Sequence, residues 1–285
     1  MNQGVKVISK AKLFLYRGVH FLLRHIACVD KSLEQKIALL SKAESKVNTE
    51  NLLAPLSVKD KFFSDITIIT HAGGGLQGMS YLNCKEAFKF YYNQGNRVFE
   101  YDVDISADDK YIATHSDTPV SEEEHLRTLV DERFLPITIK ECLDNLVAHS
   151  DIKMIFDCKF RQLGEFAQYI VDNCKSEEAL RRIVIQVFEE KNIHEIREVY
   201  DFKMLHVCMY SADYVEIANC CLSNNIGAVS VPVKAIEERT GWDVFDKSNI
   251  CAFAYSVNKL SEYKNLKDKK FTGVFSDFLY DKDVC

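Results

Sequence analysis

Two carboxylates stand two residues apart in an apolar stretch of the chain. Residues 98–104 are rich in β-branched and aromatic side chains, which predicts a strand that carries Glu100 and Asp102. Side chains two apart on a strand share one face. Carboxylates on one buried face repel each other unless a positive charge lies between them, and a hard divalent cation with oxygen ligands is the usual solution. Asp157, in a later apolar run, can supply a third carboxylate.

Other polar residues also stand at the ends of apolar runs, namely His71, His115, Lys159 and Asp277. Histidine exchanges protons near neutral pH and therefore suits acid–base chemistry. A lone Glu-x-Asp pair is typical of a solvated strand. Carboxylates and histidines at successive strand ends favour a catalytic site over a purely structural explanation.

Eight short apolar runs alternate with helical patterns after about residue 66, and this alternation indicates an α/β fold. The runs are residues 67–70, 98–104, 154–158, 183–187, 205–209, 228–231, 252–257 and 273–276, and the helical patterns are residues 84–93, 139–148, 164–173, 193–200 and 214–223. A doubly wound open sheet fits the alternation as well. Polar residues at the strand ends favour a (β/α)8 TIM barrel, because such barrels gather their catalytic groups there.

The first 60 residues form a separate region, so we predict an N-terminal helical extension over residues 1–60 and a barrel domain over residues 61–285. On a helical projection one stripe is basic and the opposite stripe is apolar, with Lys6, Lys10, Arg17 and Arg24 against Ile8, Ala11, Leu15, Val19, Leu22 and Ile26. A basic amphipathic helix of this kind packs on the main domain or attaches weakly to an anionic membrane surface. Both interpretations stay open at this point.

The composition narrows the class of protein. The chain has 285 residues and a net charge of −6, so it lacks the basic footprint of a nucleic-acid-binding protein. Its ten cysteines include no Cys-x-x-Cys pair and predict buried thiols in a reducing compartment. No apolar segment has the ~18 residues of a transmembrane helix, and no secretory signal is recognised. We therefore expect a cytoplasmic protein, peripheral at the membrane if the first helix attaches there.

The order of the segments resembles the glycerophosphodiester phosphodiesterase family. The resemblance covers residues 66–280, and the segments that carry it are residues 69–73, 83–88, 95–103, 108–117, 135–139, 157–159, 255–258 and 273–277. Thr70-His71-Ala72-Gly73 is similar to the family's opening His-Arg-Gly strand, and residues 99–103 are similar to its Glu-x-Asp-Val strand. Phosphatidylinositol-specific phospholipases share the arrangement and are close alternatives.

The resemblance implies a role for each candidate residue. Glu100, Asp102 and Asp157 would hold Mg²⁺ or Ca²⁺, and His71 and His115 would be the acid–base pair of a phosphodiester hydrolase. Lys159 and Asn83 would bind the phosphate of the substrate. The implied reaction is hydrolysis of a glycerophosphodiester-like bond in lipid metabolism. The alternatives are a phospholipase-type lyase that forms a cyclic phosphate, and an inactive barrel that binds phosphodiesters.

Three departures from the family pattern bear on the substrate. Ala72 replaces an arginine, Leu82 replaces a glutamate, and Asp157 is one methylene shorter than the usual glutamate. Ala72, followed by Gly73, Gly74 and Gly75, predicts open space beside the phosphate. The expected substrate is therefore a phosphodiester of glycerol or of a bulkier alcohol such as a sugar or inositol.

Overall fold

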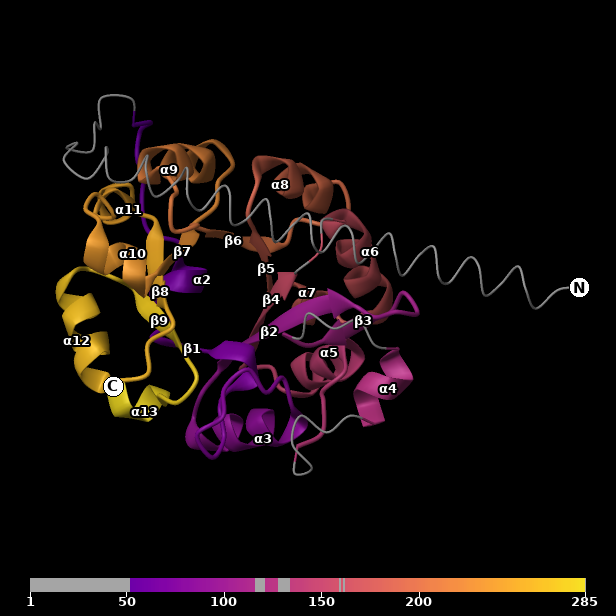
Figure 1. The fold of residues 1–285 in the computed structure, drawn as a ribbon. Coiled ribbons are helices and arrows are strands. Elements are labelled where there is room, and N and C mark those ends of the chain that lie inside the picture. Colours follow the sequence, from indigo (N-terminus) through magenta and orange to yellow (C-terminus); the bar gives the residue numbers. More distant parts are fainter. Residues whose placement is uncertain (1–51, 116–120, 128–133, 159, 161, 285) are drawn as a thin grey trace, which may run out of the picture. The chain divides into compact units, whose positions relative to one another are not determined.

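Short strands alternate with helices from residue 68 onward in the computed structural model, which describes residues 52–115, 121–127, 134–158, 160 and 162–284 (Figure 1). The strands are β1 (Ile68–Thr70), β2 (Val98–Ile105), β3 (Tyr111–Ala113), β4 (Lys153–Cys158), β5 (Ile183–Val187), β6 (Lys203–Val207), β7 (Ala228–Pro232), β8 (Cys251–Tyr255) and β9 (Gly273–Ser276). Two of the predicted runs, residues 183–187 and 273–276, match their strands residue for residue.

The parallel strands form a closed ring. Hydrogen bonds join them in the order β1-β9-β8-β7-β6-β5-β4-β2, and β2 pairs again with β1. Among the strands that the structure describes, only β3 runs antiparallel, as a hairpin partner of β2. The fold is thus a (β/α)8 TIM barrel, as predicted, and the closing β1–β2 pair excludes the open doubly wound sheet.

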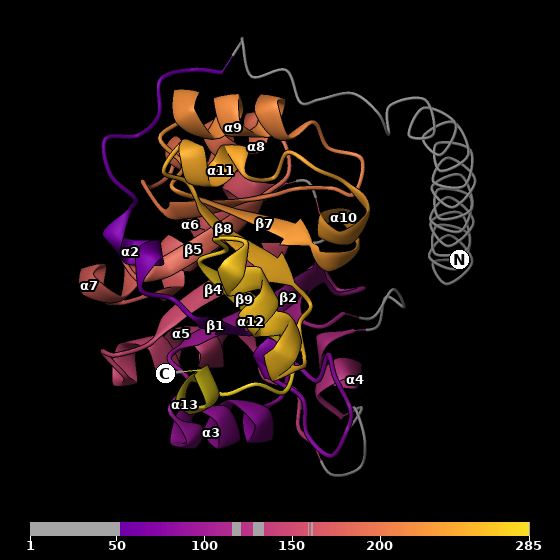
Figure 2. The same ribbon diagram turned by 90° about the vertical axis from the view of Figure 1, so that its left-hand side faces the viewer.

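Helices surround the ring in both views (Figure 1, Figure 2). They are α2 (Lys61–Ser64), α3 (Lys85–Gln94), α4 (Glu122–Arg127), α5 (Ile139–Ala148), α6 (Leu163–Asn173), α7 (Glu177–Leu180), α8 (Glu190–Arg197), α9 (Tyr214–Ser223), α10 (Val233–Glu238), α11 (Val244–Lys247), α12 (Leu260–Asp268) and α13 (Asp281–Val284), with a 3₁₀ turn η1 at His71–Gly73. Local sequence sets several of the helix ends. Thr138 and Glu141 form a capping box that begins α5, and Gly95 ends α3 in the left-handed conformation.

Alternating side chains divide the buried residues of the strands between two clusters. One cluster fills the barrel interior and includes Val98, Ile155, Phe253 and Phe275, while Phe63 of α2 joins it from the segment before β1. A larger cluster, defined by the outward-facing strand residues, packs between the strands and the helices. Each strand therefore presents every second residue to the interior, and this alternation positions the site.

The predicted helical extension lies almost wholly in residues 1–51, outside the described residues. None of the described helices is long and apolar enough to cross a membrane. The eight cysteines that the structure describes are all free, and seven of them are buried, as predicted.

Candidate active site

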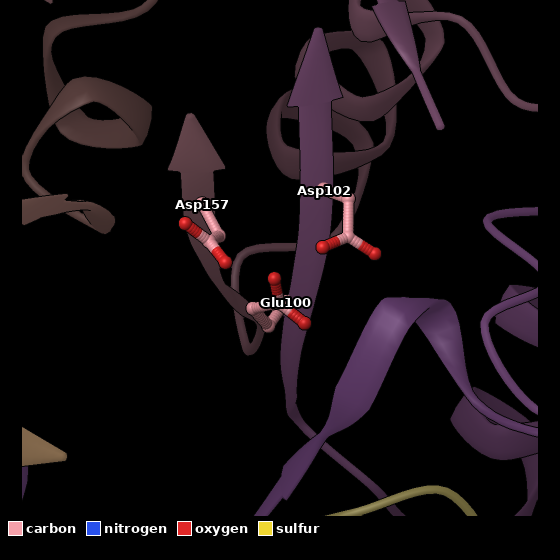
Figure 3. A group of neighbouring side chains, drawn as sticks. All are labelled: Glu100, Asp102 and Asp157. Atoms are coloured by element: carbon pink, nitrogen blue, oxygen red, sulfur yellow. The ribbon is translucent and has the colours of Figure 1, made fainter. Parts of the chain in front are cut away.

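Three carboxylates meet where β2 and β4 turn their side chains into the barrel. Glu100 and Asp102 follow the interior residue Val98 at intervals of two, and Asp157 follows Ile155 in the same way. The parallel pairing sets Asp102 opposite Asp157. One carboxylate oxygen from each of the three residues lies within 4.8 Å of the others, and Figure 3 shows the groups turned toward one another. The sequence prediction that these three residues share a site is consistent with this geometry.

Glu100 is a deeply buried carboxylate, as is Asp102. It is 1% exposed, and its Oε2 accepts a hydrogen bond from the backbone N–H of Ala72 at 2.8 Å. Its Oε1 is buried with no hydrogen-bond partner among the described residues. Burial raises the pKa of Glu100, and the charge of Asp102 raises it further.

Asn83 ties the loop before α3 to the carboxylates. Its side-chain amide donates to Asp102 Oδ2 at 3.1 Å, and its Oδ1 accepts from the Asp102 backbone N–H at 3.2 Å. The family resemblance implies a phosphate-binding role for Asn83, but its amide is engaged with Asp102 in this structure. Two buried carboxylates and the half-buried Asp157 form an all-oxygen set of repelling charges, which fits a hard divalent cation.

His71 lies beside the carboxylates because of the strand pair that closes the barrel. Thr70 of β1 pairs with Phe99 of β2, so the next residues, His71 and Glu100, are neighbours. His71 Nε2 is 4.0 Å from Glu100 Oε2, and Nδ1 is 2.9 Å from Asp277 Oδ1. A carboxylate at Nδ1 holds the proton on that nitrogen and leaves Nε2 facing the site.

Asp277 is itself held by Asn258, which is in turn held by Ser276. The Asn258 amide donates to Asp277 Oδ2 at 2.8 Å, and Asn258 Oδ1 accepts from the Asp277 N–H at 2.8 Å and from Ser276 Oγ at 3.0 Å. Burial lowers the pKa of His71, but the hydrogen bond to Asp277 and the charge of Glu100 outweigh it and raise the pKa to about 9. Asp277 therefore orients His71 and stabilises its charged form.

His115, at the end of the β3 hairpin, reaches the site through an aromatic contact. The ring of Tyr81 lies with its centroid 4.9 Å from that of His71 and 4.5 Å from that of His115. The structure thus brings both predicted histidines to one aromatic side chain. The predicted phosphate ligand Lys159 lies outside the described residues.

The expected open space beside Ala72 is absent, and that expectation was wrong. The Ala72 side chain is fully buried. A methyl group added to Gly73 would lie 2.9 Å from Tyr101, one on Gly74 would lie 2.3 Å from Tyr91, and one on Gly75 would lie 2.4 Å from Phe278. Aromatic rings occupy the space that the small residues leave, so the glycines serve close packing there.

Three residues of this site have no role predicted from the sequence, namely Asp277, Asn258 and Tyr81. Asp277 stands at a predicted strand end, but 206 residues separate it from His71, so spacing does not link the two. Asn258 and Tyr81 lie outside the strands and helices and follow no periodic pattern. The available signals were Ser276-Asp277 at the end of β9 and the resemblance of residues 255–258, and they point to the contact with His71 only once the barrel is closed.

No family model matches the chain, and no curated protein matches it. Solved structures do resemble it. A glycerophosphodiester phosphodiesterase from Thermotoga maritima is 20% identical with a TM-score of 0.55, over 74% of this chain and 94% of that one. One from Parabacteroides distasonis is 16% identical with a TM-score of 0.60, over 75% and 93%. An Oleispira antarctica phosphodiesterase in complex with the product sn-glycerol-3-phosphate is 13% identical with a TM-score of 0.59, over 75% and 93%. At these identities the likeness shows the fold.

Proposed function

We propose that the protein is a metal-dependent phosphodiesterase that hydrolyses a glycerophosphodiester-like bond. The observation that carries the proposal is the group of Glu100, Asp102 and Asp157 with oxygens within 4.8 Å, next to the His71–Asp277 pair at the carboxyl ends of the strands. Carboxylates and an oriented histidine at this end of a barrel form a catalytic arrangement rather than a stabilising one. The phosphodiesterase structures with the same fold support this class of reaction.

Glu100, Asp102 and Asp157 would hold a divalent cation, Mg²⁺ or Ca²⁺. The partnerless Oε1 of Glu100 supports a ligand role, because a buried carboxylate oxygen without a partner is costly. When bound, the cation would supply positive charge to the phosphodiester and to the oxygen that develops charge as the bond breaks. Ala72 N–H and Asn83 would orient the Glu100 and Asp102 carboxylates for this purpose.

The two histidines would move the protons of the reaction. One would take a proton from the attacking water as its oxygen bonds to phosphorus. The other would give a proton to the leaving alkoxide as its P–O bond breaks. His71 would exchange its proton at Nε2, since Nδ1 is engaged with Asp277. Lys159 stays the proposed phosphate ligand from the family resemblance.

A panel of phosphodiesters tests the proposal. Glycerol-, sugar- and inositol-linked diesters are incubated with the full chain in Mg²⁺, in Ca²⁺ and in chelator, and the products are followed by phosphorus NMR. We expect a linear phosphomonoester that forms only with a divalent cation. A cyclic phosphate would identify the lyase alternative instead.

Two carboxylate variants sharpen this experiment. Asp102→Asn should abolish cation-dependent turnover, whereas Asp144→Asn, at an exposed ion pair with Lys140 on α5, should leave turnover unchanged. Turnover at the full rate in chelator would reject metal dependence. No turnover on any diester by the folded wild-type chain would favour a barrel that only binds.

A further inference from the structure

Tyr81 lies in the irregular loop before α3, and its ring contacts both histidines of the site. Its ring meets His71 edge to face, with an interplanar angle of 75°, and meets His115 at 50°. Offset and edge-to-face contacts at these separations are attractive. The side chain is nevertheless 42% exposed, so the contacts with the two imidazoles, rather than burial in the core, account for its placement.

The backbone at Tyr81 adopts a conformation that an aromatic residue rarely takes. Its φ is +58°, in the left-handed region, and Asn83 follows with φ +43°. The surroundings fix this geometry, because Asn83 N–H donates to Ala72 O, and the Asn83 side chain exchanges two hydrogen bonds with Asp102. Strain that is maintained by such ties is typical of functional sites.

The Tyr81 ring is therefore fixed at its backbone end by the loop that Asn83 anchors. A ring held in this way can hold a neighbouring side chain.

His115 is the neighbour that depends on such support. His71 is oriented by Asp277, but His115 is exposed and makes no hydrogen bond or ion pair with any residue that the structure describes. The Tyr81 ring is its one aromatic contact among those residues. We propose that Tyr81 is a positioning residue that holds His115 beside His71, an inference whose catalytic consequence rests on the proposed function.

The ring rather than the hydroxyl should carry this role, and three variants of the full chain separate the two. Tyr81→Leu removes the ring and keeps a side chain with the same backbone preference, whereas glycine would relieve the left-handed strain and free the loop. Tyr81→Phe keeps the ring and removes only the hydroxyl. Phe90→Leu, a partly exposed aromatic on α3 that contacts Tyr91 and Tyr280, is the matched control.

Histidine NMR tests the position without requiring turnover. In protein with ¹³C-labelled histidine, the His115 signals are assigned through His115→Ala. A neighbouring aromatic ring displaces imidazole proton shifts, so Tyr81→Leu should move the His115 signals toward exposed-histidine values. Tyr81→Phe and Phe90→Leu should leave them in place. Unchanged His115 signals in Tyr81→Leu would overturn the proposal, whether or not the wild type is a phosphodiesterase.

Kinetics on the diester that the wild type cleaves test the consequence. Tyr81→Leu should lower kcat by ~10- to 100-fold with little change in KM, as expected for a displaced acid–base group. In a His115→Ala background the same substitution should cost nothing more, because Tyr81 then has nothing to position. An equal loss in both backgrounds, or a loss in Tyr81→Phe as large as in Tyr81→Leu, would refute positioning through His115.

Discussion

Two strands bring three carboxylates together inside the barrel, those of Glu100, Asp102 and Asp157. Burial and repulsion between the carboxylates raise the pKa of Glu100. A bound cation would therefore change the electrostatic energy of this site more than that of an exposed one. The neighbouring backbone N–H and amide groups orient the carboxylates but cannot neutralise three charges. The negative charge of the three carboxylates is therefore the feature of the site that predicts a cation as its ligand.

Removal of one carboxylate should weaken cation binding measurably in the absence of substrate. Asp102→Asn should raise the Kd for Mg²⁺ or Ca²⁺ by on the order of 10-fold or more, since it deletes one of three charges. Calorimetric titration measures the Kd, and the rise in Tm with added cation gives a second readout. The Asp144→Asn variant should match the wild type in both. An unchanged Kd for Asp102→Asn would place the cation elsewhere.

Each histidine should be needed for turnover. His71→Ala and His115→Ala should each lower kcat by ~10²–10⁴, the usual contribution of a general acid or base. Circular dichroism and urea unfolding should show an intact fold, because neither side chain belongs to the apolar core. Wild-type turnover by either variant on the true substrate would remove that histidine from the reaction.

At the scale of elements, the segment between β1 and α3 is built around aromatic rings. Gly74 has φ +102°, and Tyr91 lies where its side chain would be. The Tyr91 hydroxyl in turn donates to Gly75 O and to Asp277 O. This packing connects α3 to the segment after His71 and to Asp277, so the glycines support the site indirectly.

Gly74→Ala should destabilise the protein more than a glycine replacement without a clash. Backbone strain alone costs about 1 kcal/mol, and overlap with the Tyr91 ring should add about 1–3 kcal/mol. Gly95→Ala is the matched control, since Gly95 has φ +105° and no atom within 4 Å of the added methyl group. Urea unfolding measures both changes. Equal losses for the two variants would show that Tyr91 moves aside freely.

At the scale of the whole molecule, the larger apolar cluster lies between the strands and the helices rather than inside the ring. His206 of β6 stands on the helix-facing side of its strand, between Met204 and Cys208 of that cluster, and is 2% exposed. Burial lowers the pKa of His206 below its ordinary value of 6.5. The His206 imidazole is therefore neutral at pH 7 where it packs between the strands and the helices.

The buried His206 should make the fold sensitive to mild acid. Below pH 6.5 the unfolded chain binds a proton that the folded chain excludes, so the free energy of unfolding should decrease as pH falls through 6.5 toward the lower folded-state pKa. His206→Gln should reduce this slope, and His194→Gln, at an exposed position on α8, should not. Urea unfolding at pH 7.5, 6.5 and 5.5 measures the slope. A slope that His206→Gln leaves unaltered would mean that other groups cause it.

The sequence by itself determined the barrel strands and the shared face of Glu100 and Asp102. Both depend on the period of two along a strand, which each residue's near neighbours encode. The alternation of apolar runs with helical patterns also located α5 and α9 residue for residue. These features are local, so composition and spacing suffice to read them.

Only the tertiary structure decided what surrounds those carboxylates. The closing pair Thr70–Phe99 brings His71 to Glu100, and the pairing of Thr70 with Ser276 brings Asp277 to His71 across 206 residues of chain. The position of Tyr81 depends on left-handed backbone angles that no periodic pattern marks. Likewise Ala72 and its glycines looked open in sequence, but the rings that fill the space come from β2, α3 and the segment after β9. Contacts of this kind exist only once the ring of strands is closed, because closure is what makes distant residues neighbours.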